Sequence, residues 1–185
     1  MRFLPLALLV GLAPLAAAQQ SETFVRQAED ALGASAEAVT GVQGAEVALS
    51  AAALGAATTA NVAAVSQTGA GNNVELAQTG AGNRFGLAVV GDGNLISLLQ
   101  LGNDNVFLGD VVGSGNVLGP DAQGNPSVQQ GDANRYTLFL DGVSDQSHTV
   151  RQLGGGNQAT QTVGAGMQPA SIEQTGGATV VIERR

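Results

Sequence analysis

Apolar and polar residues alternate along most of this chain, in short segments of similar length. Between Asn72 and Gln78, the positions of one parity hold Val and Leu, whereas the positions between them hold Asn, Glu and Ala. A period of two residues predicts a β-strand with one buried face. The same pattern recurs in later segments and predicts a common row of inward side chains. The predicted core residues are Val74, Leu76, Phe85, Leu87, Ile96, Leu98, Phe107, Tyr136 and Leu138.

A Gly-rich phrase separates successive strands and sets their spacing. It reads QTGAGN at residues 67–72 and 78–83, and related phrases begin at residues 89, 100 and 111, a constant step of 11. After an interruption the phrase resumes at residues 129, 140, 152, 162 and 174. A fixed period is typical of a solenoid, in which each unit buries its apolar face by stacking on the next. Two units make one coil, so we predict an all-β, two-layer β-solenoid with cross-β geometry, a 22-residue repeat and about five coils.

Alternate phrases fall on opposite edges of such a stack, and the two edges differ in composition. The phrases of one edge, here called the Gln edge, begin with Gln78, Gln100, Gln129, Gln152 and Gln174. Those of the other, here called the apolar edge, begin with Gln67, Val89, Val111, Leu140 and Thr162. On the apolar edge the closing positions are Asn72, Asn94, Asn116, Asp145 and Met167.

Inward amides that recur once per coil can hydrogen-bond into a ladder, because each amide can donate to one neighbour and accept from the other. The residues predicted to form these ladders are Gln67, Gln78, Gln100, Gln129, Gln152, Gln174, Asn72, Asn83, Asn94, Asn105, Asn116, Asn134 and Asn157. A buried polar network costs free energy when it is incomplete. We therefore expect the ends of the ladders, above all on the Gln edge, to recruit further copies of the chain.

Three irregularities interrupt the repeat, and all belong to the same strand layer. They are an insertion at residues 119–125, one extra residue between Asp145 and Gln152, and Pro169. Each lies on a segment that runs from the apolar edge to the Gln edge. We predict that this layer is the bulged one.

The ends of the chain differ from the repeats. Residues 1–18 have the Arg, apolar run and small residues of a signal peptide, and we expect export. Residues 19–60 form an Ala-rich leader, expected to be flexible or partly helical, since Phe24, Ala28 and Leu32 follow Ser21 at helical spacing. The solenoid is expected over residues 61–179, with a strand end at 180–185.

Charge and cysteine content narrow the range of partners. The chain has 7 basic and 15 acidic residues, a net charge of -8 and no Cys. This balance argues against nucleic acid or an anionic membrane as a partner. We also expect no membrane-spanning segment, because the N-terminal apolar run is broken by Pro and Gly and is shorter than the roughly 20 residues that a span requires.

The Q-x-G-x-G-N phrase, its 11-residue half-repeat and its 22-residue repeat resemble the curlin repeat of bacterial curli subunits. The resemblance covers roughly residues 61–179. It implies an amyloid subunit exported through the periplasm and an outer-membrane pore into extracellular, cell-surface fibres that support adhesion and biofilm. It also implies self-association, other curlin subunits as partners, and stacking roles for the Gln and Asn ladders.

No residue pattern predicts a catalytic site, a metal site or a cofactor. His148 is the single His, and an exposed strand or loop position is expected for it. One alternative is a calcium-binding β-roll, because Asp92 and Asp132 lie in Gly-rich corners, although the other Asp residues do not keep a constant phase. Another is a β-helix enzyme acting on polysaccharide, which would need clustered carboxylates on one outer face.

Overall fold

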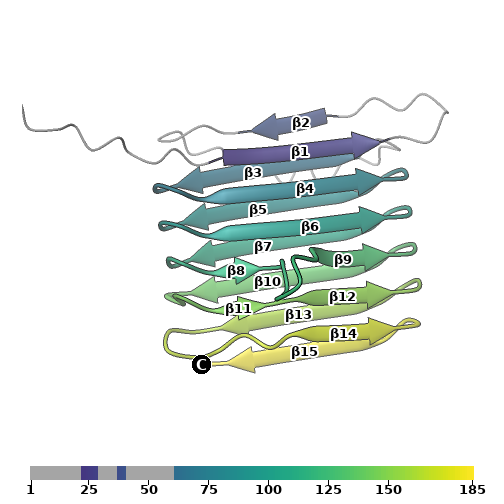
Figure 1. The fold of residues 1–185 in the computed structure, drawn as a ribbon. Coiled ribbons are helices and arrows are strands. Elements are labelled where there is room, and N and C mark those ends of the chain that lie inside the picture. The colour runs from purple at the N-terminus through teal and green to yellow at the C-terminus, as the bar shows by residue number, and fades with distance from the viewer. Residues whose placement is uncertain (1–21, 29–36, 41–60) are drawn as a thin grey trace, which may run out of the picture.

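The computed structural model describes residues 22–28, 37–40 and 61–185, and this part of the chain forms two stacked sheets of parallel strands (Figure 1). The strands of the front sheet point one way, and those of the back sheet point the opposite way (Figure 1). From β3 onward, the chain crosses from one sheet to the other at each corner. The predicted all-β, two-layer β-solenoid is therefore confirmed.

The front sheet, here called sheet A, contains strands of unequal length. In stacking order its strands are β1 (Glu22–Ala28), β4 (Asn73–Thr79), β6 (Leu95–Leu101), β9 (Ser127–Gln130), β12 (Val150–Leu153) and β14 (Ile172–Thr175). Two short strands complete it, β8 (Val117–Leu118), which pairs with β6, and β11 (Ser147–His148), which pairs with β8.

The back sheet, here called sheet B, runs without interruption between corners. In stacking order its strands are β2 (Glu37–Thr40), β3 (Val62–Thr68), β5 (Arg84–Val90), β7 (Val106–Val112), β10 (Arg135–Asp141), β13 (Gln158–Val163) and β15 (Thr179–Arg184). In the regular coils the register joins residues 22 positions apart, as where Phe85 of β5 pairs with Phe107 of β7.

The interruptions of the strands fall in sheet A, as the sequence predicted. β8 and β9 are separated by a loop, and together they cover β6, with Leu118 beside Ile96 and Ser127 beside Leu98. The loop leaves the stack between these two points and projects from its front (Figure 1). Since the flanking strands stay in register, the insertion does not disturb the coils above and below it.

The core lies between the two sheets, and an aromatic column runs through its centre. The rings of Phe85 and Phe107 stack with centroids 4.9 Å apart, and Tyr136 follows at 5.6 Å from Phe107. Gly109 leaves room for this column, because a Cβ at this position would lie 2.8 Å from the Phe107 ring. The structure buries Val74, Leu76, Phe85, Leu87, Ile96, Leu98, Phe107, Tyr136 and Leu138.

The expected helix near the N-terminus is wrong for Glu22–Ala28, which forms strand β1. In its pairing with β4, Val25 lies beside Leu76 and Gln27 beside Gln78. The physical reason is that the first coil of a stack presents unpaired backbone groups, and a parallel strand can pair with them. Leu32 and the signal peptide expected at residues 1–18 lie outside the described residues. No helix in the described ranges has the length and apolar character to cross a membrane.

Candidate functional site: the amide ladders

Close contact between the corners of neighbouring coils holds the ladders at a fixed spacing. Gly91 has a φ of 136°, and a Cβ on it would collide with the carbonyl oxygen of Gly113, one coil further on. The backbone N–H of Gly113 donates to the carbonyl of Val90 at 2.9 Å. Glycine is therefore required at such positions, both for its positive φ and for the absence of a side chain.

Five buried Gln side chains form a continuous hydrogen-bonded ladder on the Gln edge. The Nε2 of Gln78 donates to the Oε1 of Gln100 at 2.7 Å, and Gln100 donates to Gln129 at 2.8 Å. The series continues from Gln129 to Gln152 and from Gln152 to Gln174. Each Nε2 also donates to the carbonyl oxygen of the first residue of the preceding sheet B strand. Donation along this ladder runs towards the C-terminal coil.

A second ladder on the same edge runs in the opposite direction. The Nδ2 and the backbone N–H of Asn105 both donate to the Oδ1 of Asn83, at 3.0 and 3.1 Å. The same two bonds join each Asn to its predecessor in the series Asn61, Asn83, Asn105, Asn134 and Asn157. These five side chains are buried, so the network contributes to stability only while it remains complete.

The apolar edge carries a shorter Asn ladder of Asn72, Asn94 and Asn116. Gln67 is also buried on this edge, and its strand position pairs with Val89. Beyond Asn116, the backbone N–H of Gln146 contacts its Oδ1 at 3.4 Å.

Two assignments on the apolar edge are one residue out of phase and are corrected by the structure. The corner after Leu140 contains an extra residue, so Gln146 pairs with the Asn116 position and Asp145 is exposed. Leu140 pairs with Val163 rather than with Thr162, and Val163 is buried. The expected closing residue Met167 is exposed. An extra residue within a corner shifts every later phase, because the strands and not the corners keep the register.

The C-terminal ends of both ladders on the Gln edge are satisfied within the chain. Gln174 donates through Nε2 to the carbonyl oxygens of Gln158 and Ala178, each at 2.9 Å. The Oδ1 of Asn157 accepts from the backbone N–H groups of Gly177 and Ala178, each at 3.1 Å. The last corner is one residue shorter than the others and lacks an Asn, which brings these backbone groups onto the ladder ends. The expectation that this end of the Gln edge is unsatisfied is therefore wrong.

No protein-family model, curated protein or solved structure matched this chain when it was compared with them. The ladders are therefore interpreted from their own geometry. They consist of amides whose donors and acceptors are engaged with one another or with the backbone, an arrangement that supports stacking of identical coils.

The acidic residues that favoured a calcium-binding alternative have structural partners. The Oδ1 of Asp92 accepts the backbone N–H of Ala70 at 2.7 Å, and the Oδ1 of Asp132 accepts that of Asn103 at 2.8 Å. Each carboxylate thus joins its corner to the corner of the preceding coil. Within the described ranges, no three His, Asp or Glu side chains come together in an arrangement that could hold a metal ion.

Sequence reasoning missed several buried polar residues, among them His148 and Gln161. His148, on β11 of sheet A, was expected to be exposed but is buried, and burial lowers its pKa to about 4. Gln161 is buried in sheet B within 3.2 Å of the Tyr136 hydroxyl. The sequence could have indicated that both side chains point inward, because residues an even number of positions apart in a strand share a face. His148 lies four residues before the inward Gln152, and Gln161 lies four residues after the inward Asn157.

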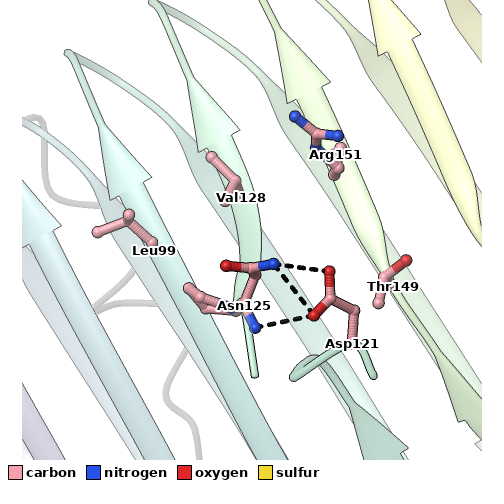
Figure 2. Close-up of a pocket in the computed structure, with 7 residues that line it drawn as sticks. Leu99, Asp121, Asn125, Val128, Thr149 and Arg151 are labelled. Carbon is pink, nitrogen blue, oxygen red and sulfur yellow. Dashed lines mark hydrogen bonds between the residues drawn. The ribbon is translucent and has the colours of Figure 1, made fainter. Parts of the chain in front are cut away.

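A cleft of about 400 Å³ lies on the outer face of sheet A, beside the inserted loop (Figure 2). Its lining includes the aliphatic Leu99 and Val128, with Asp121, Asn125 and Arg151 as polar groups. The Asp121 carboxylate accepts hydrogen bonds from the side chain and backbone of Asn125, which hold its pKa below its ordinary value. These hydrogen bonds close a turn of the inserted loop beside the cleft.

Proposed function

We propose that this protein is a structural subunit of extracellular fibres. The fibres in this proposal grow as further copies of the chain add their coils to the ends of the stack. The observation that carries the proposal is a cross-β stack built within one chain, with parallel strands in register and amide ladders along both edges. Identical chemistry at each coil allows a second copy to continue the same pattern.

The open edges of the terminal strands support head-to-tail addition. β14 and β15 are last in their sheets, and β1 and β2 are first, so each has one edge without a neighbouring strand among the described residues. Because both sheets are wholly parallel, β14 of one copy can pair with β1 of the next, and β15 with β2, without reversing direction. Such a fibre is polar.

The hydrogen bonds at the C-terminal ends of the two ladders indicate that the amides act within each subunit and not between subunits. Gln174 and Asn157 are already bonded within the chain, so the C-terminal end offers backbone groups and the half-buried Ile182 to an incoming copy. The ladders in this proposal stabilise the coils of each subunit, and the strand edges recognise the next subunit.

The resemblance to curlins supports the biological setting of this proposal. It favours export through the periplasm and an outer-membrane pore, assembly with copies of itself and with other curlin subunits, and a role in cell adhesion and biofilm. The protein in this proposal is not an enzyme and takes no cofactor.

Fibre formation by the purified chain from residue 19 onward tests the proposal directly. We expect a lag, then fibres that bind thioflavin and give cross-β diffraction at the ~4.8 Å strand spacing. Soluble monomer that persists for days at high concentration would contradict the proposal. A gain of β-structure that requires calcium and is lost with a chelator would instead favour the β-roll.

Substitutions on the two edges test the role of the ladders. Replacing Gln78, Gln100, Gln129 and Gln152 with Ala should slow elongation more than replacing Val89, Val111 and Leu140 with Gln. The first set breaks a ladder that spans five coils, whereas the second leaves it intact. Equal elongation rates for the two sets would refute a distinct role for the Gln edge.

A further inference from the structure

The outer faces of the two sheets differ in exposed apolar surface. Among the described residues, four of the five large exposed hydrophobic side chains lie on sheet B, and the fifth is Met167 in a corner. The four are Val90 (47% exposed), Val112 (37%), Phe139 (45%) and Val181 (66%). Exposed apolar side chains gathered on one face are typical of an interaction surface.

A hollow of about 240 Å³ lies in the middle of this face. It is lined by residues of three adjacent strands, Gly86 and Ala88 of β5, Leu108, Gly109 and Asp110 of β7, and Thr137 and Phe139 of β10. Small residues on β5 leave the space, and the Phe139 ring on β10 stands beside it. A flat sheet with a projecting ring and an adjacent hollow can receive a similar ring from a partner.

The charged side chains of β5 and β10 lie at the ends of these strands, whereas the exposed Asp110 lies near the middle of β7, where it pairs in register with Phe139. Arg84 and Arg135 occupy the first position of β5 and β10, and both pair in register with the first residue of β7. Asp141 is the last residue of β10, where it pairs with Val112. Strand β10 therefore has an exposed positive charge at its start and an exposed negative charge at its end.

We propose that the outer face of sheet B pairs with the same face of a second copy, the two stacks lying side by side and parallel. In this arrangement a two-fold axis runs along the stacking direction between the copies. Each β10 then faces the partner's β10 in the reverse direction, so Arg135 meets Asp141 of the second copy, twice in each pair of copies. Phe139 meets the Thr137 position, next to the hollow.

The charges exclude the other face-to-face arrangement. A two-fold axis along the strands would make the stacks antiparallel and would place the Arg84 and Arg135 column against itself. Like charges brought together at an interface oppose association. The parallel arrangement also lets both stacks grow from the same end, which agrees with a polar fibre but does not depend on fibre formation.

Charge reversal on β10 tests this pairing. Arg135→Asp and Asp141→Arg should each weaken dimerisation of the soluble chain about tenfold, measured by sedimentation velocity, because two attractive contacts become repulsive. The double variant Arg135→Asp/Asp141→Arg should restore it. In fibres, each single variant should give filaments of half the mass per length, with thioflavin elongation retained.

A matched control lies on the other sheet. Arg151 is an exposed Arg on the outer face of sheet A, 4.0 Å from Glu173. Arg151→Asp should leave both the dimer and the filament width unchanged. Loss of pairing with this variant but not with Arg135→Asp would overturn the proposal in favour of sheet A.

Two further measurements keep the test decisive. Phe139→Ser should weaken the dimer without a change in charge, and circular dichroism should show an unchanged β-signal for every variant. Since the chain has no Cys, Arg135→Cys/Asp141→Cys should crosslink between copies with a bismaleimide spanning about 10 Å, the usual distance between packed sheets. A wild-type chain that is monomeric and not crosslinked at high concentration would refute the pairing, whether or not fibres form.

Discussion

Sheets A and B share one repeat but tolerate irregularity very differently. Sheet B runs in unbroken strands from β3 to β15 and carries the aromatic column of Phe85, Phe107 and Tyr136. Sheet A is interrupted in two successive coils and buries Ser127 and His148 at positions that are apolar in its regular coils.

The difference shows that one regular layer can hold the register of a solenoid while the other accumulates insertions. In each interrupted coil the chain returns to the Gln edge, where Gln129 and Gln152 rejoin the ladder. Sheet B and the Gln edge together therefore fix the height of each coil. Sheet A only has to cover the core.

The largest expected effect comes from breaking the aromatic column. Phe107→Ala should reduce the free energy of unfolding by about 3–5 kcal/mol, because Phe85 and Tyr136 contact its ring and Gly109 offers no side chain to fill the space. Leu118→Ala in the interrupted strand of sheet A should cost about 2 kcal/mol, since the neighbouring loop can relax into the space. Denaturant unfolding of the two variants would measure the difference, and a larger loss at Leu118 would contradict the comparison.

Acidification should act on sheet A through His148. Its pKa is lowered from 6.5 to about 4 by burial, so the unfolded chain binds a proton more readily between these values. The contribution of neutral His148 to the free energy of unfolding is fully present above about pH 6.5. It is lost as the pH falls from 6.5 through 4, a loss of roughly 3 kcal/mol in total. Unfolding measured between pH 7 and 4 should show this slope, and His148→Leu should remove its His-dependent part. An unchanged slope in that variant would assign the effect to other groups.

A neighbouring pair of residues on β9 tests the Gln ladder against the outer surface. Gln129→Leu keeps the side-chain volume but leaves the ladder bonds of Gln100 and Gln152 without partners, so a loss of about 2 kcal/mol is expected. Gln130→Leu changes an exposed side chain on the same strand and should alter stability by less than about 0.5 kcal/mol. Similar values for the two variants in thermal unfolding would mean that the ladder adds little.

The smallest effect is expected from making sheet A regular. Leu118 and Ser127 pair with Ile96 and Leu98, which are separated by one residue, whereas residues 119–126 intervene between them. Replacing residues 119–126 with a single residue should change stability by no more than about 1 kcal/mol, because loop closure costs little. A much larger loss would show that the loop supports the stack.

The sequence predicted most of the fold because the repeat encodes it directly. Parity identified the inward residues, and the 22-residue step separated the Gln edge from the apolar edge. The errors arose where a corner changed length, as at Asp145 and Thr162, because counting along the chain cannot show whether a residue was added in a strand or in a corner. Strand β1 was missed because its pairing partner is distant and its own segment has no Gly-rich phrase.

The ladder ends could not be foreseen for a related reason. The sequence shows that Gln174 begins the last phrase, but not that Gly177 and Ala178 turn their backbone groups onto Asn157. That closure depends on a corner shortened by one residue, which is a property of the backbone path.

The opposed directions of the two ladders on the Gln edge have an electrostatic consequence. Gln amides align their dipoles towards one end of the stack, and Asn amides align theirs towards the other. The two columns stand side by side, so their dipoles largely cancel, as strand dipoles do within a sheet. On the Gln edge, adding coils therefore builds up little potential difference between the two ends of the stack.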